Sequence, residues 1–223
     1  MISVIVPIKG EAPSIADRFR RFVRPEECEL LIAGGACDPE AARAFEAIGG
    51  RVLQSEGTRG ARLAHAARQA RGEILFFLHA DSRPPANALE LIREAFAGGA
   101  SAGAFSLAYE DATPGLVWIA WWANLRSRVF KLPFGDQGLF CRRDLYERSG
   151  GFRDLPICDD LDIVMRWKRL DRLVVLRERT VTSARRYRAG GALSRVLRNW
   201  RVLAGYYAGV PPEKLERWYR GES

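Results

Sequence analysis

The sequence lacks the features that define several common protein classes. Its four cysteines are scattered and form no C-x-x-C pair, which argues against a disulfide scaffold or a structural zinc site and favours reduced thiols in a cytoplasmic protein. No apolar run approaches the ~20 residues that span a bilayer. The chain begins directly with a strand pattern and has no basic segment before it, so we expect neither a signal peptide nor a membrane-spanning helix.

Two nucleotide-binding fingerprints are also missing. No G-x-G-x-x-G follows the first strand pattern and no G-x-x-x-x-G-K-[S/T] occurs anywhere, which argues against Rossmann dehydrogenases and P-loop enzymes. There is no helix-turn-helix, zinc-finger or RNA-binding signature, so we do not expect nucleic acid as a partner. The net charge of +8, from 35 Lys and Arg against 27 Asp and Glu, still suits an acidic lipid surface or a phosphorylated small molecule.

The sequence does contain a regular succession of strand and helix patterns. In the first half, strands are expected at 2–6, 30–33, 51–54 and 73–78, and helices at 14–23, 38–48, 60–71 and 86–97. The strands show no polar alternation, which predicts an α/β fold with a mostly parallel sheet covered by helices on both faces. In such sheets, ligands bind beyond the carboxyl ends of the strands.

The second half is less regular. Strands are expected at 102–109, 173–176 and 181–184, helices at 114–131 and 159–170, a loop entering a strand at 133–143, and a helical tail from 192. No internal repeat, low-complexity linker or domain boundary is evident, and a chain of 223 residues can bury a substantial core. We therefore expect one domain.

A carboxylate follows the fourth strand pattern, in the segment ILFFLHADSRPP. Asp81 stands at the carboxyl end of the strand, and on an extended chain His79 points the same way because it lies two residues earlier. Asp81 is either an ordinary turn residue before Pro84 or a hard oxygen ligand for Mg²⁺ or Mn²⁺. A lone histidine such as His79 is more often a structural hydrogen-bonding residue.

Three carboxylates open the predicted helix at 159–170. Asp159 and Asp162 share one face of that helix, whereas Asp160 points about 100° away from Asp159. The helix dipole favours acidic residues in any first turn, which explains them without a function. Alternatively, one of them is a general base, and burial or a neighbouring carboxylate must then raise its pKa against the effect of the helix start.

Several arginines stand where an anion would be held. Arg185, Arg186 and Arg188 follow the last predicted strand. They are either solvated or placed to clamp a diphosphate, because guanidinium pairs bidentately with phosphate oxygens. Arg59 and Arg62, at the start of a predicted helix, show a weaker version of the same pattern.

Taken together, these segments resemble a known family. SVIVPIKGE with its strand-ending proline, the carboxylate motif after the fourth strand and the acidic pair that opens a later helix resemble family 2 glycosyltransferases of the GT-A fold. LHADSRPP, ANLRSR, PFGDQGLF, GGF, CDDLD and TSARRY further resemble the bacterial group called radical-SAM/selenodomain-associated transferase 2, up to about Arg220. The resemblance implies a single GT-A domain over 1–223, with a nucleotide-binding half (1–100), an acceptor and catalytic half (101–190) and a C-terminal helical extension (191–223).

The resemblance also implies an inverting transfer of a sugar from a nucleotide-diphosphate donor, with Mn²⁺ or Mg²⁺ on the diphosphate. HAD stands where the family carries D-x-D, which makes Asp81 the metal and diphosphate ligand and puts His79 at the first acidic position. CDD stands where relatives carry Glu-Asp, so Asp160 matches the catalytic base and Asp159 its supporting carboxylate. The other expected donor contacts are Pro7, Glu11, Gly34, Arg59, Arg185 and Arg186, and the expected sugar or acceptor contacts are Asp136 and Gln137.

One position departs from the family pattern. Ala33 stands where relatives carry an aspartate that recognises the base or ribose, and Asp38 is either a substitute for it or a helix cap. Two other functions stay open: a nucleotidyltransferase, for which PIKGEAPS is a poor triphosphate loop, and a non-catalytic nucleotide-binding or interaction protein with a degenerate donor site. The sequence names neither the donor nor the acceptor, for which a lipid-linked molecule is one candidate.

Three tryptophans, Trp118, Trp121 and Trp122, share one face of the predicted helix at 114–131. Three interpretations stay open. The rings pack in the core or form a platform for the acceptor, they form a homodimer interface, or they contact the inner face of a membrane, because Trp favours bilayer interfaces.

Overall fold

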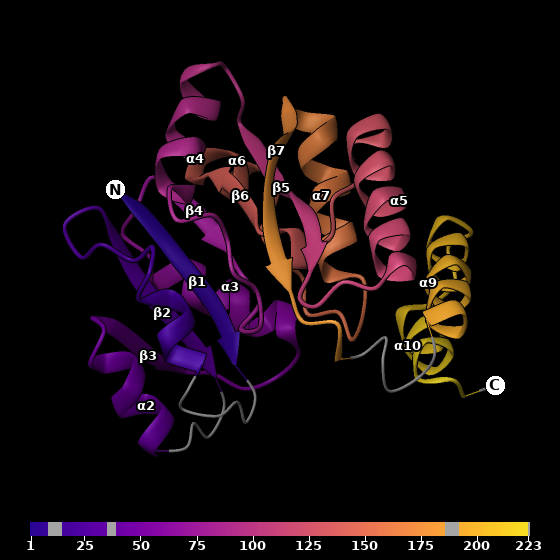
Figure 1. Ribbon diagram of the computed structural model, residues 1–223, viewed down its shortest axis with the longest axis horizontal. Helices are drawn as coiled ribbons and strands as arrows, with labels where there is room; N and C mark the ends of the chain where they lie inside the picture. Colours follow the sequence, from indigo (N-terminus) through magenta and orange to yellow (C-terminus); the bar gives the residue numbers. More distant parts are fainter. Residues whose placement is uncertain (9–14, 35–38, 186–191, 223) are drawn as a thin grey trace.

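The core of the molecule is a seven-stranded mixed sheet with the order β3-β2-β1-β4-β6-β5-β7 (Figure 1). The computed structural model describes residues 1–8, 15–34, 39–185 and 192–222. All neighbouring strands pair in parallel except β6, which is antiparallel to β4 and β5, so the predicted mostly parallel α/β sheet is confirmed. The strands are β1 (Ile2–Ile8), β2 (Cys28–Gly34), β3 (Gly50–Gln54), β4 (Ile74–Phe77), β5 (Ala102–Tyr109), β6 (Leu139–Arg142) and β7 (Leu173–Thr182).

Helices cover both faces of this sheet, as the sequence predicts. They are α1 (Ala16–Phe19), α2 (Pro39–Glu46), α3 (Arg59–Gln69), α4 (Ala88–Ala97), α5 (Pro114–Phe130), α6 (Arg143–Arg148), α7 (Asp159–Leu170), α9 (Ala192–Tyr207) and α10 (Pro212–Arg220), with a short 3₁₀ turn, η2 (Gly135–Gln137). In Figure 1, α9 and α10 lie at the end of the molecule farthest from β3.

Two apolar cores form because successive residues of a strand point to opposite faces of the sheet. Ile5 and Phe77 point to one face, where they pack with α3, α6 and α7. Val4 and Phe76 point to the other, where they pack with α1, α2 and α4. Each central strand is therefore buried on both sides, which is why its sequence is apolar throughout.

The structure differs from the prediction in its last strand. The two short strands expected at 173–176 and 181–184 are one continuous strand, β7. The exposed, charged residues Arg177, Glu178 and Arg179 interrupt the apolar pattern, but pairing with β5 resumes after an irregularity between Ala104 and Ser106. Backbone hydrogen bonds do not require apolar side chains, so the strand continues where the pattern stops.

The tail also differs, because the single helical segment expected from 192 is two helices. Gly209, at φ +73°, ends α9, and Pro211 and Pro212 follow it before α10. Proline cannot continue the hydrogen bonding of a preceding helix but fits the first turn of the next one.

The turn after β4 is fixed at the carboxyl edge of the sheet. Leu78 donates its N–H to the carbonyl of Ile5, and Ser82 donates to the carbonyl of His79. Arg83 then forms a β-bridge with Val181, near the end of β7. The segment that carries His79 and Asp81 is therefore held between the ends of β1 and β7.

Of the interpretations left open for the tryptophans of α5, packing in the core is excluded. Trp118, Trp121 and Trp122 are 58%, 54% and 44% exposed. Only the opposite side of the helix, including Leu116 and Ala120, packs on β5. Within the described residues, no helix is both long and apolar enough to cross a membrane.

The aromatic cluster around Phe76 provides a test of the core. Phe76 is fully buried, and its ring lies 5.8–6.5 Å from the rings of Phe22, Phe105 and Phe140. We expect Phe76→Ala to lower the free energy of unfolding by about 3–5 kcal/mol, because it leaves a cavity among those rings. Urea denaturation measures this. Phe130→Ala is the control, since Phe130 is 61% exposed and its loss should cost less than about 0.5 kcal/mol.

Candidate active site

A pocket of about 490 Å³ opens at the carboxyl ends of the parallel strands. One wall carries His79 and Asp81 from the turn after β4, and Asp136 from η2. The start of α7 contributes Asp159 and Asp160. The facing wall comes from the C-terminal helices, through Arg195, Asn199, Val202, Leu203, Glu216, Tyr219 and Arg220. The pocket thus combines segments from Arg59 onward, including the C-terminal helices.

The guanidinium of Arg59, the first residue of α3, connects three of these segments. Its Nε and Nη2 donate to the two carboxylate oxygens of Asp159 at 2.9 and 2.6 Å, and Nη2 lies 3.2 Å from Oδ2 of Asp160. Its Nη1 lies 2.6 Å from Nε2 of His79. Burial by itself lowers the pKa of Arg59, but the two carboxylates outweigh it and raise that pKa. Arg59 also lines the pocket, so its expected contact with a diphosphate stays a prediction beside these protein contacts.

The contact with Arg59 determines the protonation of His79. Arginine has only donors, so Nε2 of His79 accepts this hydrogen bond and the neutral ring carries its proton on Nδ1. Nε2 of His79 therefore faces the positively charged guanidinium of Arg59. The expected place of His79 in a D-x-D-like motif stays a prediction, and in the structure its ring contacts Arg59.

Asp160 is the more open member of the acidic pair, with 18% of its side chain exposed against 4% for Asp159. Its Oδ2 accepts the N–H of Gly135 at 2.8 Å, and its Oδ1 accepts the N–H of Leu161 at 2.8 Å. Burial by itself raises the pKa of Asp160, but Arg59 and these backbone N–H groups outweigh it, so that pKa is lowered. Asp160 is thus ionised and held in a fixed position.

Asp159 responds differently to the same neighbours. Burial raises its pKa, and Arg59 acts in the opposite direction. Its bidentate pairing with Arg59 occupies both oxygens, which suits the predicted role of a supporting carboxylate. Asp162 pairs with Arg153 and Arg166 and does not line the pocket.

Two glycines allow these groups to approach one another. A Cβ on Gly135 would lie 2.7 Å from Nε2 of His79 and 3.1 Å from Oδ2 of Asp160. A Cβ on Gly60 would lie 2.2 Å from the carbonyl oxygen of Arg153. The backbone at both positions therefore packs too closely for any side chain.

Asp136 lies on the pocket wall in a crowded electrostatic environment. Burial raises its pKa to about 6, with Asp160 and Asp81 adding to the shift and Arg126 opposing it. Arg126 lies over the ring of Phe134, 3.5 Å from its centroid. The predicted sugar or acceptor contact is thus in the pocket, next to the acidic pair.

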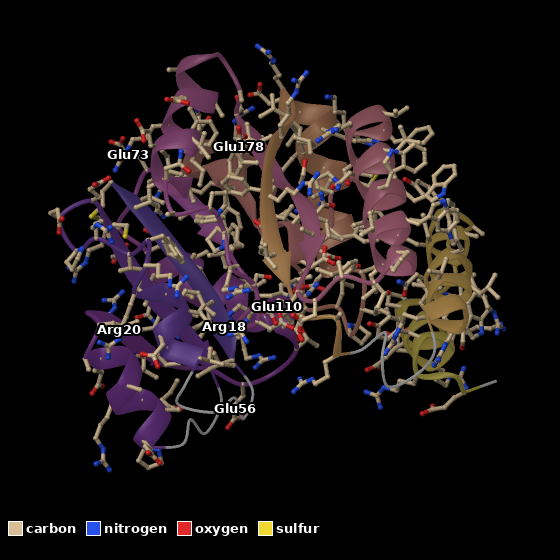
Figure 2. All side chains as sticks on the ribbon, viewed as in Figure 1. Arg18, Arg20, Glu56, Glu73, Glu110 and Glu178 are labelled. Carbon is tan, nitrogen blue, oxygen red and sulfur yellow. The ribbon has the colours of Figure 1, made fainter. Side chains whose placement is uncertain are left out.

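The turn that bears Asp81 has a support that the sequence did not reveal. Arg18 of α1 donates to the backbone carbonyl of Asp81 at 3.2 Å and pairs with Glu110 at 3.1 Å. Arg83 pairs with the same glutamate at 3.0 Å. Figure 2 shows Arg18 and Glu110 near the lower end of the sheet, where the strands end.

Asp81 fits a divalent cation only as one of several ligands. It lines the pocket, and Arg18 donates to its backbone carbonyl rather than to its carboxylate. In the part of the chain that the structure describes, no three His, Cys, Asp or Glu side chains are grouped to hold a metal. Mg²⁺ commonly takes one or two carboxylates and completes its shell with substrate phosphates. The residues present therefore fit a metal that binds together with a diphosphate.

The other predicted site residues lie at varied distances from the pocket. Gln137 is fully buried, and its amide bonds Ser127, Phe134 and Phe105, so it supports η2 and does not line the pocket. Pro7 lines a small adjoining cavity together with Arg59 and Asp160. The remaining residues are placed as follows: Gly34 ends β2, Arg185 is exposed beside the pocket segment 182–183, and Glu11, Asp38, Arg186 and Arg188 lie outside the described residues.

The facing wall contains residues that sequence reasoning missed. Arg195 of α9 stacks on Tyr219 of α10, with 5.1 Å between the guanidinium carbon and the ring centroid, and both line the pocket. The tail was expected only as a helical extension. Its density of arginines was visible in the sequence, but no motif shows that it folds back over the strand ends.

Comparison with known proteins supports the fold. No protein-family model matches the sequence, and no curated protein matches it. Residues 1–349 of S. aureus TarS, solved in complex with UDP-GlcNAc, share 16% identity with it at a TM-score of 0.66 over 82% of this chain and 58% of that chain. Another structure of the same TarS fragment gives 0.67 over 88% of this chain and 64% of that one, at 16% identity.

A mannosyltransferase, PcManGT from Pyrobaculum calidifontis, solved in complex with GDP-Man and Mn²⁺, gives a TM-score of 0.61 at 19% identity, over 81% of this chain and 56% of that chain. This chain thus spans less than two thirds of the length of these structures. The narrower radical-SAM/selenodomain-associated group stays a prediction. The comparisons show that the chain has a GT-A-like α/β fold.

The Arg59 contacts generate a stability prediction. We expect Arg59→Met to lower the free energy of unfolding by about 3 kcal/mol, because it leaves the carboxylate of Asp159 buried and unpaired. Urea denaturation measures this. Arg68→Met, on the exposed side of the same helix, should change it by less than about 0.5 kcal/mol. Equal effects of the two substitutions would contradict the proposed role of Arg59.

The raised pKa of Asp136 generates a pH prediction. The folded protein binds this proton more tightly than the unfolded chain, so its contribution to stability falls as pH rises from about 4 to about 6. We expect Asp136→Asn to gain up to about 3 kcal/mol relative to wild type between pH 4 and pH 7. Denaturant titrations across this range measure the gain. The exposed control Asp17→Asn should show no such gain, and a pH-independent difference for Asp136→Asn would exclude the shift.

Proposed function

We propose that this protein is an inverting, metal-assisted glycosyltransferase that moves a sugar from a nucleotide-diphosphate donor to a hydroxyl group of an acceptor. The observation that carries the proposal is the ionised carboxylate of Asp160, fixed by backbone N–H groups and Arg59 on the wall of a pocket that also contains Asp81. The GT-A-like fold supports the same conclusion, since TarS and PcManGT were solved with nucleotide sugars.

Asp160 is the proposed general base. The acceptor oxygen attacks the anomeric carbon from the side opposite the diphosphate, and the bond to the leaving phosphate oxygen breaks with its electron pair on the nucleoside diphosphate. The acceptor proton passes to Asp160. A carboxylate with a lowered pKa is a weak base, so this proton moves as the new bond forms, when the hydroxyl has become acidic. Asp159 and His79 keep Arg59 against Asp160 during these changes.

Asp81 is the proposed metal and diphosphate ligand. A divalent cation bound there would neutralise charge that builds on the leaving diphosphate. Donor contacts are proposed for the first half of the chain, 1–100, and acceptor contacts for 101–190. The helices of the extension, 191–223, add a second wall, through Arg195 and Tyr219, to the acceptor side.

A panel of nucleoside diphosphates tests the donor site. We expect one of UDP, GDP, CDP and TDP to raise the melting temperature in the presence of Mn²⁺, since a ligand at 100 times its dissociation constant adds about 2.7 kcal/mol. Asp81→Asn should remove the metal-dependent part of this shift. If no nucleotide stabilises the protein, the donor site is absent and the non-catalytic alternative is favoured.

The same preparation tests the base. Asp160→Asn should retain the nucleotide-induced shift but lower the release of nucleoside diphosphate from the matching nucleotide sugar by about 10²–10⁴-fold. Asp144→Asn is the control, because its carboxylate is 65% exposed and lies outside the pocket. Unchanged release by Asp160→Asn would overturn the assignment of the base.

A further inference from the structure

Helix α5 exposes the largest apolar side chains that it carries. Trp118 and Trp121 are each more than half exposed, and both rings contact Trp122 edge to face, with centroids 5.9 and 5.0 Å apart. At the end of the helix, Val129 and Phe130 are 60% and 61% exposed. An exposed apolar patch of this kind marks an interaction site more often than a free surface.

Helix α9 adds a second exposed apolar face. Leu197, Trp200 and Tyr207 are 61%, 57% and 52% exposed, and their spacing of three and seven residues places them on one side of the helix. Val202 and Leu203, elsewhere on the helix, line the pocket. Helix α9 is therefore both a wall of the pocket and an outer surface, and Figure 1 shows α5 and α9 toward the end of the molecule away from β3.

The charges of these two helices all have one sign. Neither α5 nor α9 contains an Asp or a Glu, and Lys131 follows α5 directly. Arg128, Lys131 and Arg201 are exposed. Tryptophan beside lysine and arginine is the composition of surfaces that bind the headgroup region of a bilayer.

The same charges argue against a symmetric dimer through this surface. A two-fold interface brings the same patch of both subunits together. Here it would place arginines opposite arginines, with no carboxylate of α5 or α9 to pair with them. An anionic lipid surface supplies the missing negative charge and an apolar layer for the rings.

We propose that the exposed faces of α5 and α9 dock the protein on a membrane surface that contains anionic lipid. Docking does not depend on the proposed transferase activity. One consequence does: because α9 also lines the pocket, a docked protein would hold its pocket near the headgroups, which suits an acceptor carried by a lipid.

Co-sedimentation of the full chain with vesicles tests the proposal. We expect binding to vesicles of equal parts phosphatidylcholine and phosphatidylglycerol, weaker binding at high salt, and little binding to phosphatidylcholine alone. The double variant Trp118→Ser/Trp121→Ser should bind the anionic vesicles at least about tenfold more weakly, because two interfacial rings are lost. Both residues are exposed, so circular dichroism and the melting temperature should match wild type.

A matched pair of charge variants tests whether vesicle binding needs this surface or only the overall positive charge of the protein. Lys131→Asn should weaken binding about fivefold, and asparagine tolerates the left-handed backbone of that position, φ +54°. Arg20→Gln removes one exposed positive charge near α2, far from α5 (Figure 2), and should leave binding unchanged.

Three results would overturn the proposal. They are absence of wild-type binding to anionic vesicles, equal binding by the tryptophan double variant, and equal weakening by Lys131→Asn and Arg20→Gln. Sedimentation velocity tests the alternative, in which a second copy of the chain covers this surface. A wild-type dimer that the double variant dissociates, without vesicle binding, would assign this surface to a second copy of the chain.

Discussion

The pocket depends on one partly buried guanidinium. Arg59 binds Asp159 and Asp160 of α7 and His79 of the turn after β4, and it stands at the start of α3. These groups lie on three segments that are far apart in the sequence. A charge buried among polar groups is stable only when every partner is in place. The position of the acidic pair and the packing of α3 on α7 are therefore one structural feature, and Gly60 and Gly135 provide the close approach that it needs.

The neighbouring carboxylates of Asp159 and Asp160 have different surroundings, and their proposed roles differ for that reason. Asp159 is almost completely buried and gives both oxygens to Arg59, so its charge holds the network together. Asp160 shares the same cation but is also bound by backbone N–H groups, which favour its charged form and leave part of it exposed to the pocket. Adjacent residues at a helix start can thus have opposite pKa shifts. The difference arises from burial and hydrogen bonding and not from residue type.

The C-terminal helices form part of the pocket wall and part of the outer surface of the protein. Helix α9 packs through Leu203 and Tyr206 on the core that contains α7, and it presents Trp200 to solvent. Together with α10 it closes the side of the pocket that faces the strand ends. A partner bound to the outer face of α9 would therefore act on an element that also shapes the pocket. Helix α9 therefore belongs both to the proposed membrane-docking surface and to the proposed acceptor side of the pocket.

The sequence by itself determined the α/β class, most of the elements, and the location of Asp81, Asp159 and Asp160 at strand and helix ends. It did so because these features follow from local hydrophobic period and residue type. Only the tertiary structure decided that Arg59 binds Asp159, that Gln137 is buried, and that the tryptophans of α5 are exposed. The residues of the Arg59–Asp159 pair are 100 positions apart, and no local pattern specifies which distant group will fill a buried position. The antiparallel insertion of β6 and the folding of α9 and α10 over the strand ends have the same origin, since both are set by contacts between segments far apart in the chain.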